Sequence, residues 1–194
     1  GHVAIEHIFV NRLLQFLFYK FFSNVQGVLE LGCGTAKNLI ILRKIFPNHA
    51  LFGADWSKHT LDIIRLISKK KNENINGVQL NMLTLEGIEK LPPLENKAIL
   101  SVGSFEQLGS KWKPIFDYLL ANNPEIVVNI EPIEEFYHAD SLFDESALVY
   151  HRKRNYLKGY FSALKDFERK NLINIVYHER LFFGSDRHEG YSVV

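Results

Sequence analysis

The sequence predicts a doubly wound α/β fold, in which a mostly parallel sheet of seven strands is covered by helices and ends in a C-terminal antiparallel strand. Three observations predict it. Five short apolar segments alternate with segments of helical periodicity. These apolar segments are continuous, as expected for parallel strands that are buried on both faces. Two further strand-like segments near the end of the chain flank a turn-like stretch and would close the sheet.

The strands are expected where the apolar runs lie. The five parallel ones are "GVLEL" at 27–31, "ALFGA" at 50–54, "GVQL" at 77–80, "AILSVG" at 98–103 and "EIVVNI" at 125–130. The closing pair is expected from "INIVYHERLFF" at 173–183 and "GYSVV" at 190–194, on either side of "GSDRHE".

Helices are expected between the strands. One covers Ala36 to Phe46 and is ended by Pro47, one follows Ser57 as its N-cap, and one covers Pro114 to Ala121. The last long helix is expected from roughly Arg154 to Glu168. Within residues 1–24 an amphipathic helix is expected to pack on the sheet through six apolar residues: Ile5, Ile8, Phe9, Leu13, Phe16 and Leu17.

Length and composition limit the class of protein. The 194 residues fit a single domain covering 1–194, and 46% apolar with 23% charged residues is typical of a soluble globular protein. The net charge of +1 disfavours a general nucleic-acid binder, so no DNA partner is expected. Cys33 is the only cysteine, which excludes an intramolecular disulfide and suggests a cytoplasmic setting. Charged residues interrupt every apolar run before the ~18 residues of a membrane-spanning helix, so no transmembrane segment is expected.

The stretch "VLELGCGTAKNL", from Val28 to Leu39, contains the strongest functional signal. Two glycines separated by one residue follow a strand directly and precede a helix, which lets a ligand approach the backbone without obstruction by Cβ atoms. Open parallel sheets bind ligands at this end of their strands. A nicotinamide-dinucleotide loop would have glycine at a third position, which here is Lys37.

The acid Glu30 two residues before the glycine pair completes a different pattern. The stretch resembles motif I of the class I S-adenosylmethionine-dependent methyltransferases, of the small-molecule type. The resemblance implies a Rossmann-like methyltransferase fold, S-adenosylmethionine as cofactor and S-adenosylhomocysteine as product. It also implies that Glu30, Gly32, Cys33 and Gly34 surround the methionine half of the cofactor.

The ends of the next strands add candidates for the rest of the cofactor. Asp55 ends the second strand, where a carboxylate can accept hydrogen bonds from both ribose hydroxyls. Trp56 is placed to lie against an adenine face. The alternatives are a helix-entry cap for Asp55 and core packing for Trp56. The family resemblance implies that Asn81 and Met82 meet the adenine, although Asn81 also suits a turn without a ligand.

The loop after the fourth strand, "SVGSFEQLGS", resembles the small-molecule methyltransferases in layout, and Gly103 within it is a further cofactor candidate. In those enzymes a Glu-His-Leu-like triplet follows, whose histidine can act as a base. Here the triplet is Glu106-Gln107-Leu108, so that histidine is absent. The strand ends without an aspartate and the histidines lack ligand spacing, so no metal site is expected.

Residues 131–168 are long, aromatic and charged, and we expect them to form a substrate lid. His151 is the first candidate for the catalytic base and His138 the second, with a solvated or structural histidine as the alternative for each. The run "HRKR" at 151–154 would lie near the start of the last helix and attract an anion, such as a phosphorylated saccharide. The alternatives are a solvated basic face and ion pairs with Asp144 and Glu145.

The resemblance therefore predicts methyl transfer to an oxygen, or as second choice a nitrogen, of a small-molecule acceptor such as a metabolite or saccharide. A non-catalytic S-adenosylmethionine-binding module, or a domain of a larger assembly protein, is the alternative. A nicotinamide oxidoreductase is disfavoured by Lys37, and RNA methylation stays open. The sequence indicates neither the methylated atom nor the oligomeric state.

Overall fold

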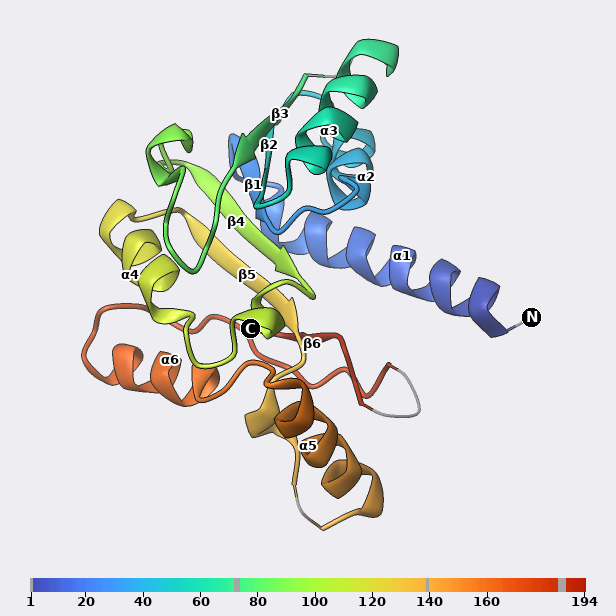
Figure 1. Cartoon of the computed structure of the whole chain (residues 1–194), viewed down its shortest axis with the longest axis vertical. Coiled ribbons are helices and arrows are strands. Elements are labelled where there is room, and N and C mark those ends of the chain that lie inside the picture. The colour runs from blue at the N-terminus through green and yellow to red at the C-terminus, as the bar shows by residue number, and fades with distance from the viewer. Residues whose placement is uncertain (1, 72–73, 139, 185–187) are drawn as a thin grey trace.

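The computed structural model describes residues 2–71, 74–138, 140–184 and 188–194 (Figure 1). Its helices are α1 (His2–Phe22), α2 (Lys37–Ile45), α3 (Lys58–Lys71), α4 (Lys113–Asn122), α5 (Leu142–Arg154) and α6 (Tyr160–Arg169). Its strands are β1 (Gly27–Leu31), β2 (Ala50–Asp55), β3 (Ile75–Gln79), β4 (Lys97–Val102), β5 (Ile126–Glu131) and β6 (Ser192–Val193). Three short 3-10 helices are η1 (Ile88–Lys90), η2 (Phe105–Leu108) and η3 (Glu134–Phe136).

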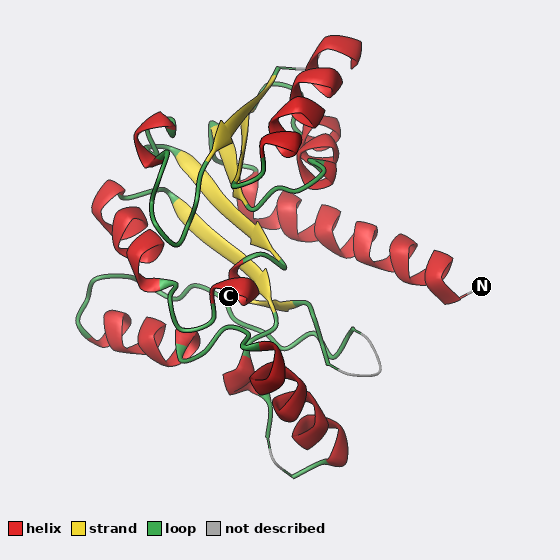
Figure 2. Cartoon of the chain, in the orientation of Figure 1, coloured by secondary structure: helices red, strands yellow, loops and turns green. Residues whose placement is uncertain are grey.

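The strands form one sheet in the order β3-β2-β1-β4-β5-β6, which is parallel except for β6 (Figure 2). The predicted doubly wound α/β class is confirmed. Because the strand order reverses between β1 and β4, the loops that follow these two strands meet at the switch point, where such sheets bind ligands.

Helices cover the sheet on both faces. On one face Val28 and Val128 pack in a core with residues of α1, α2 and α3, and on the other Leu29 and Ile99 pack with residues of α4 and α6. Residues adjacent along β1 therefore enter opposite cores, as the alternation of a strand requires. Figure 1 shows α5 outside these two layers, beyond the carboxyl end of β5.

The sheet has six strands among the described residues, where we predicted seven. The expected strand at 173–183 is reduced to a single bridge between Glu179 and Val193. Two features explain this difference: β6 is only two residues long, and the backbone N–H of Ile175 donates to the Glu168 carboxylate instead of to a strand. The predicted turn at 184–189 includes residues 185–187, which lie outside the described residues.

The helix expected from Arg154 to Glu168 begins later, as α6 at Tyr160, and Arg154 is instead the last residue of α5. α5 ends at Arg154, Asn155 is left-handed (φ 53°), and Gly159 is left-handed (φ 64°) just before α6 begins. The basic run at 151–154 thus forms the last turn of a helix, where its charge complements the macrodipole. The prediction that these charges require an anion at a helix N-terminus was wrong.

α1 covers the segment predicted as an amphipathic helix, but it buries a different face. Its buried residues are Val10, Leu14, Leu17, Phe18 and Phe22, which repeat at helical spacing. Of the predicted stripe, Ile8 and Phe16 are 63% and 62% exposed, whereas Leu17 is buried. Ile5 lies outside the residues whose side chains are described. No helix in the described part of the chain is both long and apolar enough to cross a membrane.

Candidate cofactor and acceptor site

The glycine loop after β1 uses its two glycines differently. Gly32 has a positive φ (73°), and a Cβ there would lie 2.3 Å from Cβ of Ser104 in the loop after β4. Gly34 also has a positive φ (50°), but a Cβ there would meet nothing within 4 Å. Gly32 thus allows the two loops to pack together, while Gly34 leaves open space beside the backbone.

Glu30 lies at the end of β1 with only 1% of its surface exposed. Its Oε1 accepts a hydrogen bond from Asn38 Nδ2 at 2.6 Å, while Oε2 is buried with no hydrogen-bond partner among the described residues. Burial raises the pKa of Glu30 to about 8; the Asn38 hydrogen bond opposes this rise, and the charge of Asp55 adds to it. A buried carboxyl oxygen without a partner is costly, so a ligand group that donates to Oε2 would be stabilised here.

Asp55 ties the end of β2 to the glycine loop. Its Oδ2 accepts from the backbone N–H of Gly34 at 3.0 Å and its Oδ1 from that of Ser57 at 2.9 Å. The second bond is the helix-entry contact that we considered as the alternative function of this residue. Each carboxylate oxygen keeps a lone pair that can accept a further hydrogen bond. Trp56 is 74% exposed and is therefore not packed in the core.

Asn81 and Met82 follow β3 at the same edge of the sheet. Asn81 Oδ1 accepts from the backbone N–H groups of Leu83 and Thr84 at 2.9 and 3.3 Å, so it already caps a turn. Met82 lies against the glycine loop, because its Cε is 3.7 Å from the point that a Cβ on Gly32 would occupy.

Cys33 and Gly103 have backbones at this edge but differ in their surroundings. The Cys33 thiol is buried against Gly53 of β2, and this burial raises its pKa. Only the backbone of Cys33 is thus left for a ligand. Gly103 has a positive φ (61°), its N–H donates to the Ile130 carbonyl at 3.1 Å, and a Cβ there would meet nothing within 4 Å.

The loop after β4 is held by the buried side chain of Glu131 at the end of β5. Its Oε1 accepts from the backbone N–H groups of Ser104 and Phe105, and its Oε2 from that of Glu106, each at 3.1 Å. Burial raises the pKa of Glu131, and a hydrogen bond with the Ser101 side chain, followed by these backbone donors, opposes the rise. The Ser104 hydroxyl also donates to the Leu31 carbonyl at 2.7 Å. The loop is therefore fixed on both sides.

Glu106, on this fixed loop, is a candidate proton acceptor that the sequence did not reveal. Burial, and next the charge of Glu131, raise its pKa to about 7, while a hydrogen bond with Tyr156 and the charge of Arg154 oppose this shift. Both opposing residues come from the end of α5 and the turn after it. A half-buried carboxyl with a pKa near neutrality, between the cofactor loop and the expected lid, can exchange protons with a substrate. The triplet Glu106-Gln107-Leu108 was the available signal, because its acid keeps the place at which the family's triplet begins.

His151 is fully buried in a cluster of rings. Its centroid lies 5.1 Å from Tyr137, 5.6 Å from Tyr156 and 5.2 Å from His188, and neither ring nitrogen has a hydrogen-bond partner within the described ranges. Burial, with the charge of His188, lowers its pKa to about 4, so the imidazole is neutral at pH 7. His138 is exposed, and its backbone N–H donates to Asp144.

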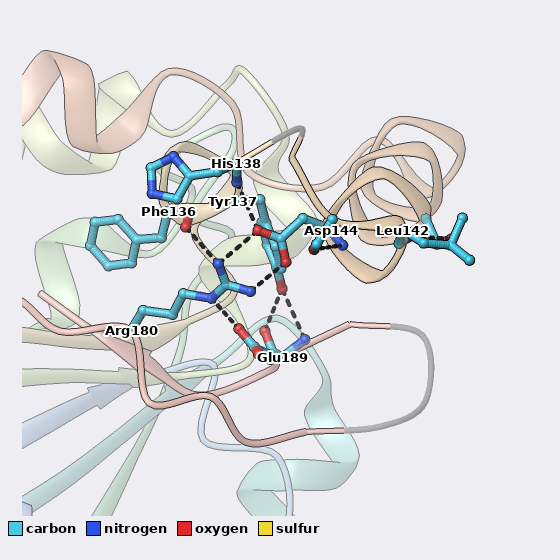
Figure 3. A network of polar contacts seen from close by, with 9 residues as sticks. Phe136, Tyr137, His138, Leu142, Asp144, Arg180 and Glu189 are labelled. Carbon is cyan, nitrogen blue, oxygen red and sulfur yellow. Dashed lines mark hydrogen bonds and ion pairs between the residues drawn. The ribbon is translucent and has the colours of Figure 1, made fainter.

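Arg180 joins two segments of the expected lid, at Phe136 and Asp144, to the segment that contains Glu189 (Figure 3). Its guanidinium donates to both carboxylate oxygens of Asp144 at 2.6 and 2.8 Å, to the Phe136 carbonyl at 3.0 Å, and to the Glu189 carboxylate. It also lies 4.7 Å from the ring centre of Tyr137, whose hydroxyl donates to the Glu189 carbonyl. Asp144 therefore pairs with Arg180 and not with the basic run at 151–154. The sequence offered no local signal for this network.

Solved structures similar to this chain include several methyltransferases. SibL, an S-adenosylmethionine-dependent methyltransferase in its apo form, gives a TM-score of 0.63 at 15% identity, covering 100% of this chain and 56% of that one. The methyltransferase domain of a bacterial CtHen1 gives 0.64 at 15%, covering 94% and 93%. The plantazolicin methyltransferase BpumL, crystallised with a monoazolic desmethylPZN analogue and S-adenosylhomocysteine, gives 0.52 at 17%, covering 86% and 64%.

The chain thus spans only about three fifths of the length of BpumL and SibL. No protein-family model matches the sequence, and no curated protein matches it. The similarity in structure, together with the sheet order, identifies the fold as that of the class I S-adenosylmethionine-dependent methyltransferases.

Proposed function

We propose that this chain is an S-adenosylmethionine-dependent methyltransferase that methylates an oxygen, or as second choice a nitrogen, of a small-molecule acceptor. The observation that carries the proposal is the buried Oε2 of Glu30, which has no partner among the described residues and lies beside an open glycine loop. The solved methyltransferases of similar fold support it.

The residues at the switch point fit the cofactor. Glu30 would accept a hydrogen bond from the ammonium group in the methionine part of the cofactor, which would give Oε2 its missing partner. Gly34 and Gly103 would let the cofactor approach the backbone, and Asp55 would accept from the ribose hydroxyls through its remaining lone pairs. We place Met82 and the exposed Trp56 beside the adenine. When bound, S-adenosylmethionine supplies an electrophilic methyl group on a sulfonium sulfur.

The protein's own task is then to orient the acceptor and take up its proton. We propose that the carboxylate of Glu106 accepts this proton. With a pKa of about 7 it is partly ionised at pH 7, and the contacts of Glu131 with its loop hold it in place. Tyr156 and Arg154 would orient that carboxylate. His151 stays the alternative base, but its ring is fully buried, so the residues around it would have to move. The phosphorylated saccharide loses its support, because the basic run ends a helix.

The direct test of this function is transfer of a labelled methyl group from S-adenosylmethionine. We would supply three separate acceptor pools: small phenols, alcohols and amines; unstructured peptides; and RNA. The proposal expects label in the small-molecule pool. Label only in peptides or RNA would overturn the acceptor class. Cofactor binding without label in any pool would favour the non-catalytic binding module.

The variant Glu30→Gln is expected to weaken S-adenosylhomocysteine binding about 10- to 100-fold at pH 8, because a charge-assisted hydrogen bond is lost. The folded-state pKa of Glu30 is about 8 and the ordinary value is 4.5. Between these two pH values the folded protein keeps a proton on Glu30 that the unfolded chain has released. The stability contributed by this group is present below about pH 4.5 and is lost as the pH rises through about 8. The variant should therefore resist heat better than wild type at pH 8, although it binds less cofactor.

Calorimetric titration and thermal unfolding measure both effects. The exposed Glu95→Gln is the matched control and should change neither. If Glu30→Gln instead binds S-adenosylhomocysteine as tightly as wild type, Glu30 does not meet the ammonium group.

A further inference from the structure

A chain of buried polar side chains connects α6 to the loop that carries Glu106. Tyr160, the first residue of α6, donates its hydroxyl proton to Oδ1 of Asn129 in β5 at 2.7 Å. Nδ2 of Asn129 donates to the hydroxyl oxygen of Ser101 in β4 at 2.9 Å. The Ser101 side chain is in turn hydrogen-bonded to the carboxylate of Glu131. Each of these four linked side chains belongs to a residue that is at most 2% exposed.

The sheet brings three of these side chains to one face. Ser101 and Asn129 are partners in the register of β4 and β5. Asn129 and Glu131 lie two residues apart on β5, so they point to the same side. Apolar side chains would fill this space without the cost of burying polar groups. The chain can act at its end, where Glu131 accepts from the backbone N–H groups of residues 104–106.

Only one arrangement of the protons gives Glu131 a donor from Ser101. A serine hydroxyl has one proton, and an asparagine amide has one accepting and one donating end. While Tyr160 donates to Oδ1 of the amide, the NH2 end faces Ser101 and leaves the serine proton for Glu131. If the amide turned round, its oxygen would take the serine proton and Glu131 would lose this donor. The Tyr160 hydroxyl therefore fixes the hydrogen bonding of a carboxylate that it does not touch.

We propose that this hydrogen-bonded chain keeps Glu131 ionised and thereby fixes the loop that carries Glu106. Tyr160, Asn129 and Ser101 are then positioning residues. Both oxygens of Glu131 accept hydrogen bonds from the loop, as an ionised carboxylate does. The inference rests on the proposed function only for the chemical role of Glu106.

The charge of Glu131 makes the effect of the chain measurable at Glu106. This charge is, after burial, the second cause of the raised pKa of Glu106. The other groups that act on Glu106 are Arg154 of α5 and Tyr156 after it, and Tyr150 acts on these two. When the serine donor is lost, ionised Glu131 becomes less favourable and carries less charge. The pKa of Glu106 should then fall below about 7.

Two variants test the chain. Tyr160→Phe removes the hydroxyl and keeps the ring that contacts Phe105 and Trp112, and Ser101→Ala removes the donor to Glu131. The measurement is an NMR titration of the ¹³C-labelled carboxyl of Glu106, assigned by its absence in Glu106→Gln.

Each variant is expected to lower the midpoint of this titration by about one pH unit. Tyr118→Phe is the matched control, because it removes a hydroxyl from another tyrosine packed against the same core, and it should leave the midpoint unchanged. Tyr160→Phe added to Ser101→Ala should cause no further change, because it acts through the serine proton. Circular dichroism verifies that each protein is folded.

The rate of methyl transfer gives a second readout. At a pH above the midpoint, both variants should lower kcat about tenfold and leave KM for S-adenosylmethionine unchanged, because a misplacement of ~1 Å can cost about a hundredfold. Folded Tyr160→Phe with the midpoint of Tyr118→Phe would overturn the inference, as would a further fall in the double variant. Wild-type protein that transfers no methyl group would instead overturn the proposed function, and the titration would still decide the inference.

Discussion

Glu106→Gln is expected to slow methyl transfer by about 10²- to 10⁴-fold and to leave the affinity for S-adenosylhomocysteine unchanged. A general base contributes this factor when it removes a proton in the transition state, and an amide cannot do so. The shape of the side chain is kept, as is the contact of Glu131 with the backbone of residue 106. The measurement is the rate of label transfer to whichever acceptor the pools identify, with a calorimetric titration beside it.

The dependence on pH gives a second readout for the same residue. The pKa of Glu106 is about 7, and a base acts in its ionised form, so the wild-type rate should rise with pH through about 7 and then level off. This rise should be absent in Glu106→Gln. Gln107→Ala, which changes the exposed neighbour, should keep both the rate and the rise. A wild-type rate in Glu106→Gln would assign the base elsewhere, and His151→Ala would be the next variant to measure.

Arg180→Met is expected to destabilise the protein by about 3–5 kcal/mol, because it leaves two buried carboxylates without their cation. The side chains of Arg180, Asp144 and Glu189 are 12%, 6% and 10% exposed. For a domain of this size the loss corresponds to a fall in Tm of roughly 10 °C. Thermal and urea unfolding would measure it.

The matched control is Arg169→Met, which breaks an ion pair whose partners are 76% and 55% exposed and should cost less than about 1 kcal/mol. The contact with Arg180 lowers the pKa of Asp144 from 3.8 to about 2. The stability from Asp144 is thus present above about pH 3.8 and is lost as the pH falls toward about 2, a dependence that Arg180→Met should lack. Equal losses of stability in the two arginine variants would mean that the Arg180 network contributes no more than a surface pair.

The fold was predictable from the sequence where local patterns decide it. The run "GVLEL" is β1 residue for residue, and the other four parallel strands lie where the apolar runs indicated. The face of α1 was not predictable, because apolar residues occur nearly all round the helix and the pattern does not select one side. The division between α5 and α6 had a signal that was overlooked: Asn155 and Gly159 are residue types that adopt left-handed conformations.

The cofactor candidates could be proposed from the sequence because each lies at or just beyond the carboxyl end of a strand, and parallel strands bring these ends to one edge. Glu30, Gly34 and Asp55 do meet there, through the hydrogen bond from Gly34 to Asp55 and the charge of Asp55 on Glu30. The lid could not be derived in this way. Arg180 meets Asp144 across 36 residues of sequence, and Glu106 meets Tyr156 across 50, so only the folded chain reveals these pairs.

The most direct test of the account is a calorimetric titration of the wild-type chain with S-adenosylhomocysteine, with NADH as the competing ligand and Gly34→Ala as the control protein. We expect micromolar binding of S-adenosylhomocysteine alone, and about 2.7 kcal/mol of added stability at 100 times the dissociation constant. Gly34→Ala should lose about 1–2 kcal/mol of stability to its positive φ (50°) and still fold, because its Cβ meets nothing within 4 Å. It should lose the binding, because that Cβ fills the space for the cofactor. Folded wild-type protein that binds neither ligand, or that binds NADH instead, would contradict the assignment of this loop to a methyl donor.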